Sequence, residues 1–473
     1  MATAALLIWP FLSVCLFAFL GFKRGLVVSV IVGYLFLPTR FGIDFPGLPR
    51  LGKTSMIAIG ALLGYLLFSG QTKKELSNIR MTDRMFVLCF FGLVILSLIS
   101  PVLTALTNQE ALFFGPTTLR GLSLQEAFRP MWRAFVSGVI LFLGWRFLSS
   151  PTDHRLLLIT LVGAALVYSV LAVFEMRMAP QLSHWIYDIR PDDFGQHVRN
   201  GAYRPIIFLT HGLAVGLFIL TSAIASAALS RSAGARQASL FVFATLWLFA
   251  ILILSRNFGA TLLAALFVPI VFLIGSGWQV RIGAIIAAAF LIYPTLRQAG
   301  VVPYQYVLRI AEYFSANRAA SFAYRLNSEE HLVERASLKP FFGWGGYGRS
   351  RIVNEFGKDV ITPDGEWVIT LGLYGWFGYL VLFGIIALPL FWLVKTRRRK
   401  AVPVVTTGMV LIVAANFIDL IPNSTLSPIT LLMVGALAGF VTWDKSDQDN
   451  PDQDIPTPQR RTPGKLRYSR FGS

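Results

Sequence analysis

The sequence predicts an all-α fold: a polytopic membrane bundle of about 12 to 14 transmembrane helices with one large structured extracytoplasmic loop. Only 14% of the 473 residues are charged and 55% are hydrophobic, whereas soluble domains carry about 25% charged residues. Apolar runs of roughly 17 to 25 residues recur between short polar breaks. Helices are expected because they satisfy their own backbone groups in lipid, and the short alternating segments of a β-barrel are not found.

About thirteen apolar segments are the expected spans. Three of them are short, so a total of about twelve or fourteen spans also fits the sequence. The first is interpreted as a retained helix, because it lacks a basic leader and is followed by Lys23 and Arg24. Cys15 and Cys89 both fall inside expected spans, which excludes a disulfide framework. The segments are 4–21, 25–38, 55–69, 85–106, 131–148, 155–178, 205–229, 238–254, 258–274, 281–295, 366–394, 402–419 and 425–442.

The basic cluster from Lys395 to Lys400 orients the chain, because positively charged loops stay in the cytoplasm. Alternation from it places the other short basic loops on the same side, so the net charge of +18 is partly topological and indicates no nucleic-acid partner. The predicted regions are an N-terminal bundle (1–296), a large extracytoplasmic loop (297–365), C-terminal helices (366–442) and a cytoplasmic tail (443–473). The composition of the tail is typical of disorder.

Arginines also gather on the predicted outer side, where the charge rule does not require them. Guanidinium groups suit bidentate capture of phosphate, and the alternative for most of them is pairing with acids of the same loop. Arg256 is the strongest candidate, because it lies in a short break between two apolar runs. The arginines taken as substrate-binding candidates are Arg199, Arg204, Arg256, Arg325, Arg349 and Arg351.

The polar stretch 297–365 is too long for an ordinary connector, and hydrophobic and aromatic residues recur through it. The segment from Asn327 to Pro340 predicts a short helix with an asparagine cap that ends at the proline. The glycine-rich turn that follows offers Trp344 and Tyr347 as flat faces for sugar rings. The alternative is a tight structural turn with an aromatic anchor at the membrane surface.

His211 follows Arg204 by seven residues at the start of an expected span, a spacing that puts both on one helix face. A lone histidine in a span commonly bonds a neighbouring helix; facing the arginine, it would line a path for the acceptor. Histidines and carboxylates do not cluster at ligand spacing, so a metal site is not expected.

Three segments resemble the O-antigen ligase and polysaccharide polymerase family of bacterial inner-membrane proteins. They are RNGAYRPIIFLTHGLAVG from Arg199, SRNFGATLL from Ser255, and the loop end FFGWGGYG with the later DGEWVITLGLYGWFGYL from Asp364. Each segment alone is weak evidence for the family. The order and spacing of the three segments make the resemblance more specific, and it covers about Arg199 to Leu380. No nucleotide-binding motif competes with it.

The resemblance implies transfer of a glycan from a polyprenyl-diphosphate donor to a sugar hydroxyl on the outer face of the inner membrane, without metal or cofactor. It implies that Arg204, or Arg199, holds the diphosphate together with Arg256. The ligases commonly carry a histidine after the large loop, where this sequence has Asp364 and Glu366. Either carboxylate is a candidate catalytic base, and the alternative is an Asp-Gly turn that caps the next helix.

Polymerase is favoured over ligase because that histidine is missing. A flippase of lipid-linked oligosaccharide is the other alternative, and the lack of an internal repeat counts against it. The expected partners are a polyprenyl-diphosphate-linked oligosaccharide and the lipid bilayer, with a chain-length regulator or export machinery as further candidates.

Overall fold

Helices account for almost all of the regular structure. The computed structural model of the protein describes residues 1–445 except 46–48, 73–78, 82, 116, 191–193, 200, 302–308, 310–311, 313–315, 355–357 and 362. Among these residues, seven helices are long and apolar enough to cross a membrane. The all-α prediction is therefore confirmed, and the protein is a multi-pass membrane protein.

The helices stand where the apolar segments predict them. The long apolar helices are α1 (Ala2–Leu20), α5 (Arg84–Leu106), α7 (Pro151–Met178), α9 (Gly212–Ser232), α10 (Ala235–Leu254), α12 (Ser276–Gln298) and α15 (Glu366–Thr396). Shorter apolar helices are α3 (Lys53–Phe68), α11 (Phe258–Leu273), α16 (Val404–Asp419) and α17 (Pro428–Thr442). The other helices are α2 (Phe22–Phe36), α6 (Leu124–Phe147), α8 (Leu182–Tyr187) and α14 (Ala316–Ser337), with 3-10 turns η1 (Ser69–Thr72) and η2 (Phe194–His197).

Short antiparallel strand pairs close several of the connections. Their strands are β1 (Gly42–Ile43) with β2 (Leu51–Gly52), β3 (Ile79–Met81) with β8 (Trp443–Lys445), β4 (Leu112–Phe114) with β5 (Thr117–Leu119), and β6 (Val198–Arg199) with β7 (Ala202–Tyr203). The β3–β8 pair joins two segments that are far apart in the sequence.

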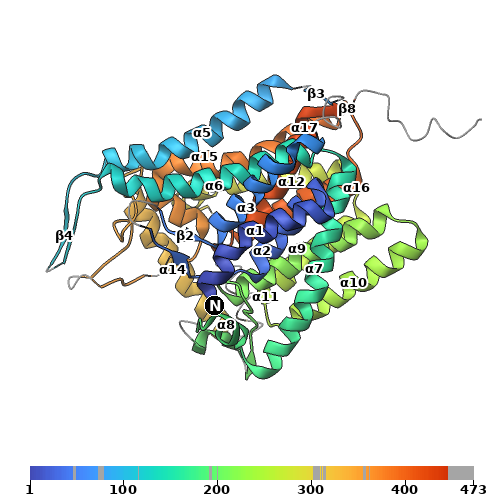
Figure 1. Ribbon diagram of the computed structural model, residues 1–473. Helices are drawn as coiled ribbons and strands as arrows, with labels where there is room; N and C mark the ends of the chain where they lie inside the picture. The colour runs from blue at the N-terminus through green and yellow to red at the C-terminus, as the bar shows by residue number, and fades with distance from the viewer. Residues whose placement is uncertain are drawn as a thin grey trace, which may run out of the picture.

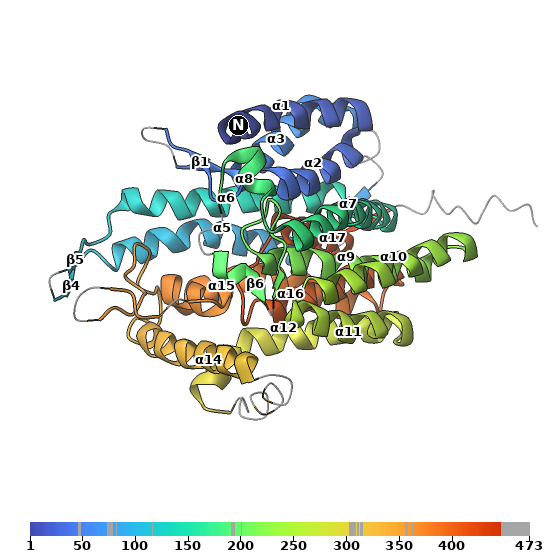
Figure 2. The same ribbon diagram turned by 90° about the horizontal axis from the view of Figure 1, so that it is seen from below.

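The bundle has two distinct ends. Figure 1 shows the β4–β5 hairpin and α14 at one end and the β3–β8 pair at the other. Turned by 90°, Figure 2 shows α1 to α3 on one side and α14 on the opposite side, with α5, α6, α15 and α17 between them. Helices α9, α16 and α17 are buried along nearly all of their length and form the core.

Helix α15 is broken near its start, where Gly375 adopts a φ of 63°. The break is filled by the glycine-rich loop, because Trp344 N donates to Gly372 O (2.8 Å) and Trp376 N donates to Pro340 O (2.7 Å). A Cβ atom on Gly343 would lie 2.6 Å from the backbone of Gly375 and Leu373. The glycines therefore allow two backbones to approach closely, as the structural-turn alternative predicts.

Two expectations about helix boundaries are wrong. The span expected at 205–229 begins only at Gly212, because Glu175 accepts the backbone N–H groups of Ile206 and Ile207 at 2.8 and 2.7 Å. Arg204 and His211 therefore do not share a helix face. The short helix expected from Asn327 is part of the longer α14, so Asn327 is an interior residue and not a cap.

The expected tail at 443–473 begins as a strand instead, since Trp443–Lys445 is β8. The rest of the tail, 446–473, lies outside the described residues.

Candidate functional site

A cavity of about 780 Å³ opens between α2, α3, α5, α6, α15 and α17, beside the segment that precedes α9. Its wall carries four cationic side chains and one carboxylate: Arg40, Arg50, Lys53, Arg133 and Glu366. Apolar residues of α5, α6, α15 and α17 continue the same wall, among them Val94, Leu141, Ile385 and Leu431. The cavity thus joins a strongly basic region to an apolar one.

Two of the cations are held by backbone carbonyls of the segment before α9. An Nη atom of Arg40 donates to Thr210 O at 3.0 Å. Lys53 Nζ donates to Phe208 O at 3.1 Å and lies 5.3 Å from the centre of the Tyr34 ring. The two carbonyl oxygens orient both side chains toward the segment before α9.

The other two cations are less restrained. Arg50 Nε lies 3.8 Å from Asp44 Oδ2 in an exposed ion pair, which contributes little at a surface. For Arg133, on α6, no hydrogen bond or ion pair is found within the described part of the chain. Arg133 interacts electrostatically with Glu366 across the cavity.

Glu366 is the first residue of α15 and lies at the cavity wall. Its backbone N–H donates to Leu420 O at 3.1 Å and Asn423 O at 3.0 Å. The side-chain carboxylate accepts a hydrogen bond from the Ser424 hydroxyl. The backbone bonds fix the start of the helix, so the carboxylate stands at a defined place beside the cations.

Asp364, the other expected base, has a different environment. Its Oδ2 atom lies 3.1 Å from Arg325 Nε in an ion pair, and it is not part of the cavity wall. Arg325 is thus matched by an acid, as the pairing alternative predicts. The structure separates the two carboxylates that the sequence could not tell apart.

The break between α10 and α11 contacts Arg204 through Asn257. Arg204 is buried, and its Nε donates to Asn257 Oδ1 at 2.7 Å. Asn257 Nδ2 in turn donates to Ser255 Oγ at 3.0 Å. Arg256 is exposed, has a φ of 55° and does not line the cavity. Neither Arg204 nor Arg256 lines the cavity, and the clamp of the two arginines stays a prediction.

His211 precedes α9 as its N-cap, where Nδ1 accepts the backbone N–H of Leu213 at 3.1 Å. Its ring centre is 5.0 Å from that of His197. Burial lowers the pKa of His211 to about 3, and the nearby Arg204, His197, Arg40 and Arg325 add to the effect. His211 is therefore neutral at physiological pH, and Arg204 and Arg325 do gather around it.

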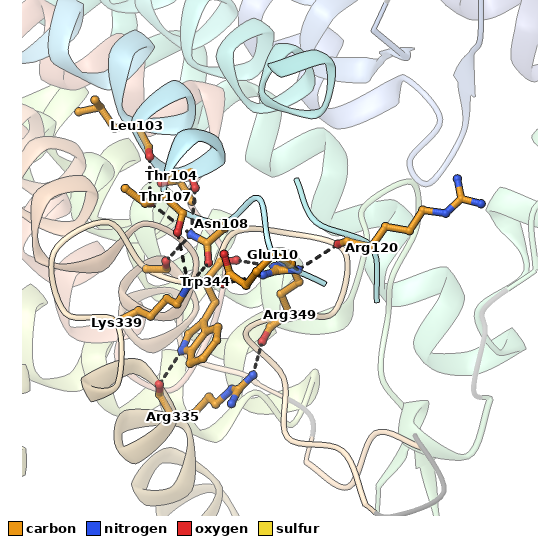
Figure 3. A network of polar contacts seen from close by, with 11 residues as sticks. Leu103, Thr104, Thr107, Asn108, Glu110, Arg120, Arg335, Lys339, Trp344 and Arg349 are labelled. Carbon is orange, nitrogen blue, oxygen red and sulfur yellow. Dashed lines mark hydrogen bonds and ion pairs between the residues drawn. The ribbon is translucent and has the colours of Figure 1, made fainter. Parts of the chain in front are cut away.

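The glycine-rich loop is fastened to the β4–β5 hairpin by Arg349, which is completely buried (Figure 3). Its guanidinium donates to the carbonyls of Trp344 (3.2 Å), Glu110 (3.0 Å) and Arg120 (2.9 Å) and lies 3.3 Å from the Glu110 carboxylate. The partners of the Arg349 guanidinium are therefore groups inside the protein. The substrate-binding role expected for Arg349 is therefore replaced by a structural one.

Trp344 is likewise internal, with only 7% of its surface exposed. Its Nε1 donates to Arg335 O at 2.6 Å, and the Arg335 guanidinium lies 3.6 Å from the ring centre. A sugar ring cannot stack on that covered face, which corrects the expectation for Trp344. Tyr347 remains half exposed, and Arg351 forms an ion pair with Asp359.

We expect Arg349→Met to lower the free energy of unfolding by about 3 kcal/mol, because it leaves buried carbonyls without donors. Arg351→Met is the matched control, since its exposed ion pair contributes at most about 1 kcal/mol. Thermal unfolding of the two purified variants in the same detergent measures the difference. Equal midpoints for both variants would contradict the structural role of Arg349.

Helix α14 packs against α12 and α15 and brings Glu329 into a buried place beside Arg297 of α12. Arg297 donates to Leu326 O at 3.0 Å, and its Nε lies 4.0 Å from Glu329 Oε2. Burial raises the pKa of Glu329 to about 7, although Arg297 opposes the shift. The folded state thus binds this proton more tightly than the unfolded state, whose pKa is near 4.5.

We expect the docking of α14 to weaken as the pH rises. The stability that Glu329 contributes is fully present below about pH 4.5 and is lost as the pH passes about 7. Hydrogen exchange of α14 amides, corrected for the intrinsic pH dependence, measures the change between about pH 5 and pH 8. In Glu329→Gln the change should disappear; a pH dependence that persists in this variant has another source.

The remaining expected residue, Arg199, lies on β6, where its backbone pairs with Ala202; its side chain is outside the described part of the chain. The sequence interpretation missed Arg40, Arg50, Lys53 and Arg133. A signal for them existed, because alternation from the basic cluster places all four in or beside loops of the predicted outer side, where the charge rule does not require them.

The arrangement can bind an anionic headgroup and accept a proton next to it. Among the described residues, no group of three or more histidine, cysteine or acidic side chains is placed to hold a metal ion. The sequence matches no protein-family model, and no curated protein is similar to it.

Proposed function

We propose that this protein is a membrane glycosyltransferase that polymerises or transfers a lipid-linked oligosaccharide. It moves the glycan from a polyprenyl-diphosphate donor to the hydroxyl of an acceptor sugar. The observation that carries the proposal is the cavity of about 780 Å³ with four cations and one carboxylate on its wall. Such a cavity matches a ligand with two phosphates, an apolar tail and a reacting sugar.

In this proposal the cations hold the diphosphate. Backbone carbonyls orient Lys53 and Arg40, which form the fixed pair. Arg133 lines the cavity from α6. The apolar wall formed by α5, α6, α15 and α17 takes the first isoprene units. Arg204, Arg256 and Arg325 are not assigned to the diphosphate, since the first and third have partners in the fold and the second does not line the cavity.

Glu366 is the proposed base. The acceptor hydroxyl oxygen forms a bond to the anomeric carbon of the donor sugar, and the bond from that carbon to the diphosphate breaks. Its electron pair stays on the leaving diphosphate oxygen, where the cations stabilise the charge. The hydroxyl proton passes to the Glu366 carboxylate, which the Ser424 hydroxyl orients.

The same proposal fixes the sides of the membrane. The cavity, α14 and the β4–β5 hairpin face the outside of a bacterial inner membrane, and the basic cluster from Lys395 to Lys400 faces the cytoplasm. Cysteine-accessibility labelling in intact cells distinguishes this orientation from the opposite one.

Purified protein and a polyprenyl-diphosphate oligosaccharide test the proposal. We expect longer or transferred glycan together with one equivalent of released polyprenyl diphosphate per bond formed. In sealed vesicles, a flippase would instead move the intact donor across the bilayer without covalent change, and that result would refute a transferase.

A further inference from the structure

We infer that Glu175 is a positioning residue that places the two fixed cations of the cavity through the backbone of the segment before α9. Glu175 lies in the last turns of α7 and does not line the large cavity. The inference deepens the proposed function and rests on it for its consequence in catalysis. The positioning of Lys53 and Arg40 by Glu175 is argued from hydrogen bonds and does not depend on the proposed function.

The first observation is that the Glu175 carboxylate is buried and accepts hydrogen bonds on both of its oxygens. Glu175 is 1% exposed. One oxygen, Oε2, accepts the N–H groups of Ile206 (2.8 Å) and Ile207 (2.7 Å), and the other accepts the N–H of Leu182 at 3.1 Å. A buried carboxylate is costly unless its oxygens are hydrogen-bonded, and backbone N–H groups supply these bonds here, so the carboxylate ties that backbone to α7.

The second observation is strain at the captured segment. Ile207 has a φ of 58°, in the left-handed region, where a β-branched side chain is rarely found. Its own N–H is one of the two donors to Glu175, so the carboxylate holds the strained conformation in place. Strain of this kind persists where the surrounding structure over-determines it, and it gathers at functional sites.

The third observation is where the segment leads. The carbonyl that follows Ile207, on Phe208, accepts from Lys53, and the carbonyl of Thr210 accepts from Arg40. A second, much smaller cavity of about 20 Å³ is lined by both Glu175 and Arg40. The contacts therefore connect one carboxylate, through the backbone of residues 206–210, to two cations.

The segment has one more support from α7. The Tyr168 hydroxyl accepts the N–H of Phe208 and donates to Leu35 O, both at 3.3 Å. Tyr168 and Glu175 are both on α7, so this helix holds the segment before α9 through two side chains. Tyr168 is the weaker contact because it reaches the segment through one hydrogen bond.

Glu175→Leu tests the inference, since it keeps an apolar volume at the site and removes both acceptor oxygens. We expect the reaction of Lys53 with acetic anhydride, followed by mass spectrometry in the detergent-purified protein, to become about fivefold faster. The exposed Lys358 is the internal reference and should not change. The donor KM of glycan transfer should rise by a similar factor.

Glu175→Gln is the conservative variant, because its amide oxygen can still accept from Ile206 and Ile207. Its Lys53 reactivity should stay within about twofold of the wild type. Should Glu175→Leu fail to fold, Tyr168→Phe removes a weaker support and is expected to raise the Lys53 reactivity by about twofold.

The outcomes separate the two proposals. Lys53 that reacts at the wild-type rate in folded Glu175→Leu overturns the positioning role, whatever the enzyme activity. Faster Lys53 labelling in Glu175→Leu, in a protein whose wild type makes no glycan, supports the positioning role while the transferase proposal fails.

Discussion

Glu366→Gln is expected to lower kcat for glycan transfer by about 10²- to 10⁴-fold, the usual contribution of a positioned general base. The amide has the size of the carboxylate and can still accept the Ser424 hydroxyl, so the start of α15 should be preserved. It cannot take the proton of the acceptor hydroxyl. The measurement is kcat at saturating donor and acceptor, with equal amounts of folded protein by gel filtration.

Binding of the donor gives a second, independent reading of the same variant. Among the described residues, Glu366 is the one carboxylate on a cavity wall that carries four cationic side chains, and its removal makes the cavity more positive. The affinity for polyprenyl diphosphate should therefore stay the same or increase while kcat falls. A variant that loses donor affinity instead would show that Glu366 supports the fold of the site and is not the base.

Asp364→Asn is the matched control for the base. Asp364 lies two residues away on the same turn but pairs with Arg325 and does not line the cavity. Its loss should lower kcat by less than about tenfold. Equal losses in Asp364→Asn and Glu366→Gln would remove the distinction that the structure draws between them.

The positions of the helices could be predicted from the sequence because the bilayer fixes their length and apolarity. Apolar runs such as 85–106 and 366–394 have helices at the expected places, α5 and α15. The start of α9 could not be predicted, because Ile206 and Ile207 are apolar and continue the run. Their N–H groups are captured by a carboxylate some thirty residues earlier, and such a contact leaves no periodic signal.

The candidate cavity contains the kinds of residue that the sequence suggests for the site, cations and a carboxylate. Of the predicted site residues, Glu366 lines its wall. The four cations were missed because the resemblance drew attention to the second half of the chain. They come from the first 133 residues, and only tertiary packing brings them to Glu366.

Trp344 and Arg349, two of the predicted binding residues, are buried in the structure. A glycine-rich turn with Trp344 and Arg349 has the composition of a sugar- and phosphate-binding loop. The break in α15 is a backbone feature that the sequence pattern does not predict. The loop supplies hydrogen-bond partners to the backbone groups of α15 at this break. Once the loop is held there, Trp344 and Arg349 lie inside the joint with the hairpin (Figure 3).

Arg133→Gln is expected to lower kcat for glycan transfer by about 10²- to 10³-fold, the effect of removing one group that stabilises the charge developing in the transition state. Arg133 lines the cavity, and no hydrogen bond or ion pair within the described residues would be lost with it, so the folded state should be unaffected. Thermal unfolding and kcat are measured on the same preparation.

Arg129→Gln, one turn earlier on α6, is the control that isolates the cavity from the general field of the protein. Arg129 is also exposed but does not line the cavity, so its removal takes away the same charge from the same helix. Charges at the surface are screened by salt within about 10 Å at 0.1 M, and transfer by Arg129→Gln should stay close to the wild-type rate. If both variants lose activity equally, and the loss is reversed at low salt, the cations act by attracting the donor over a distance. A loss confined to Arg133→Gln and independent of salt places the guanidinium in direct contact with the leaving diphosphate.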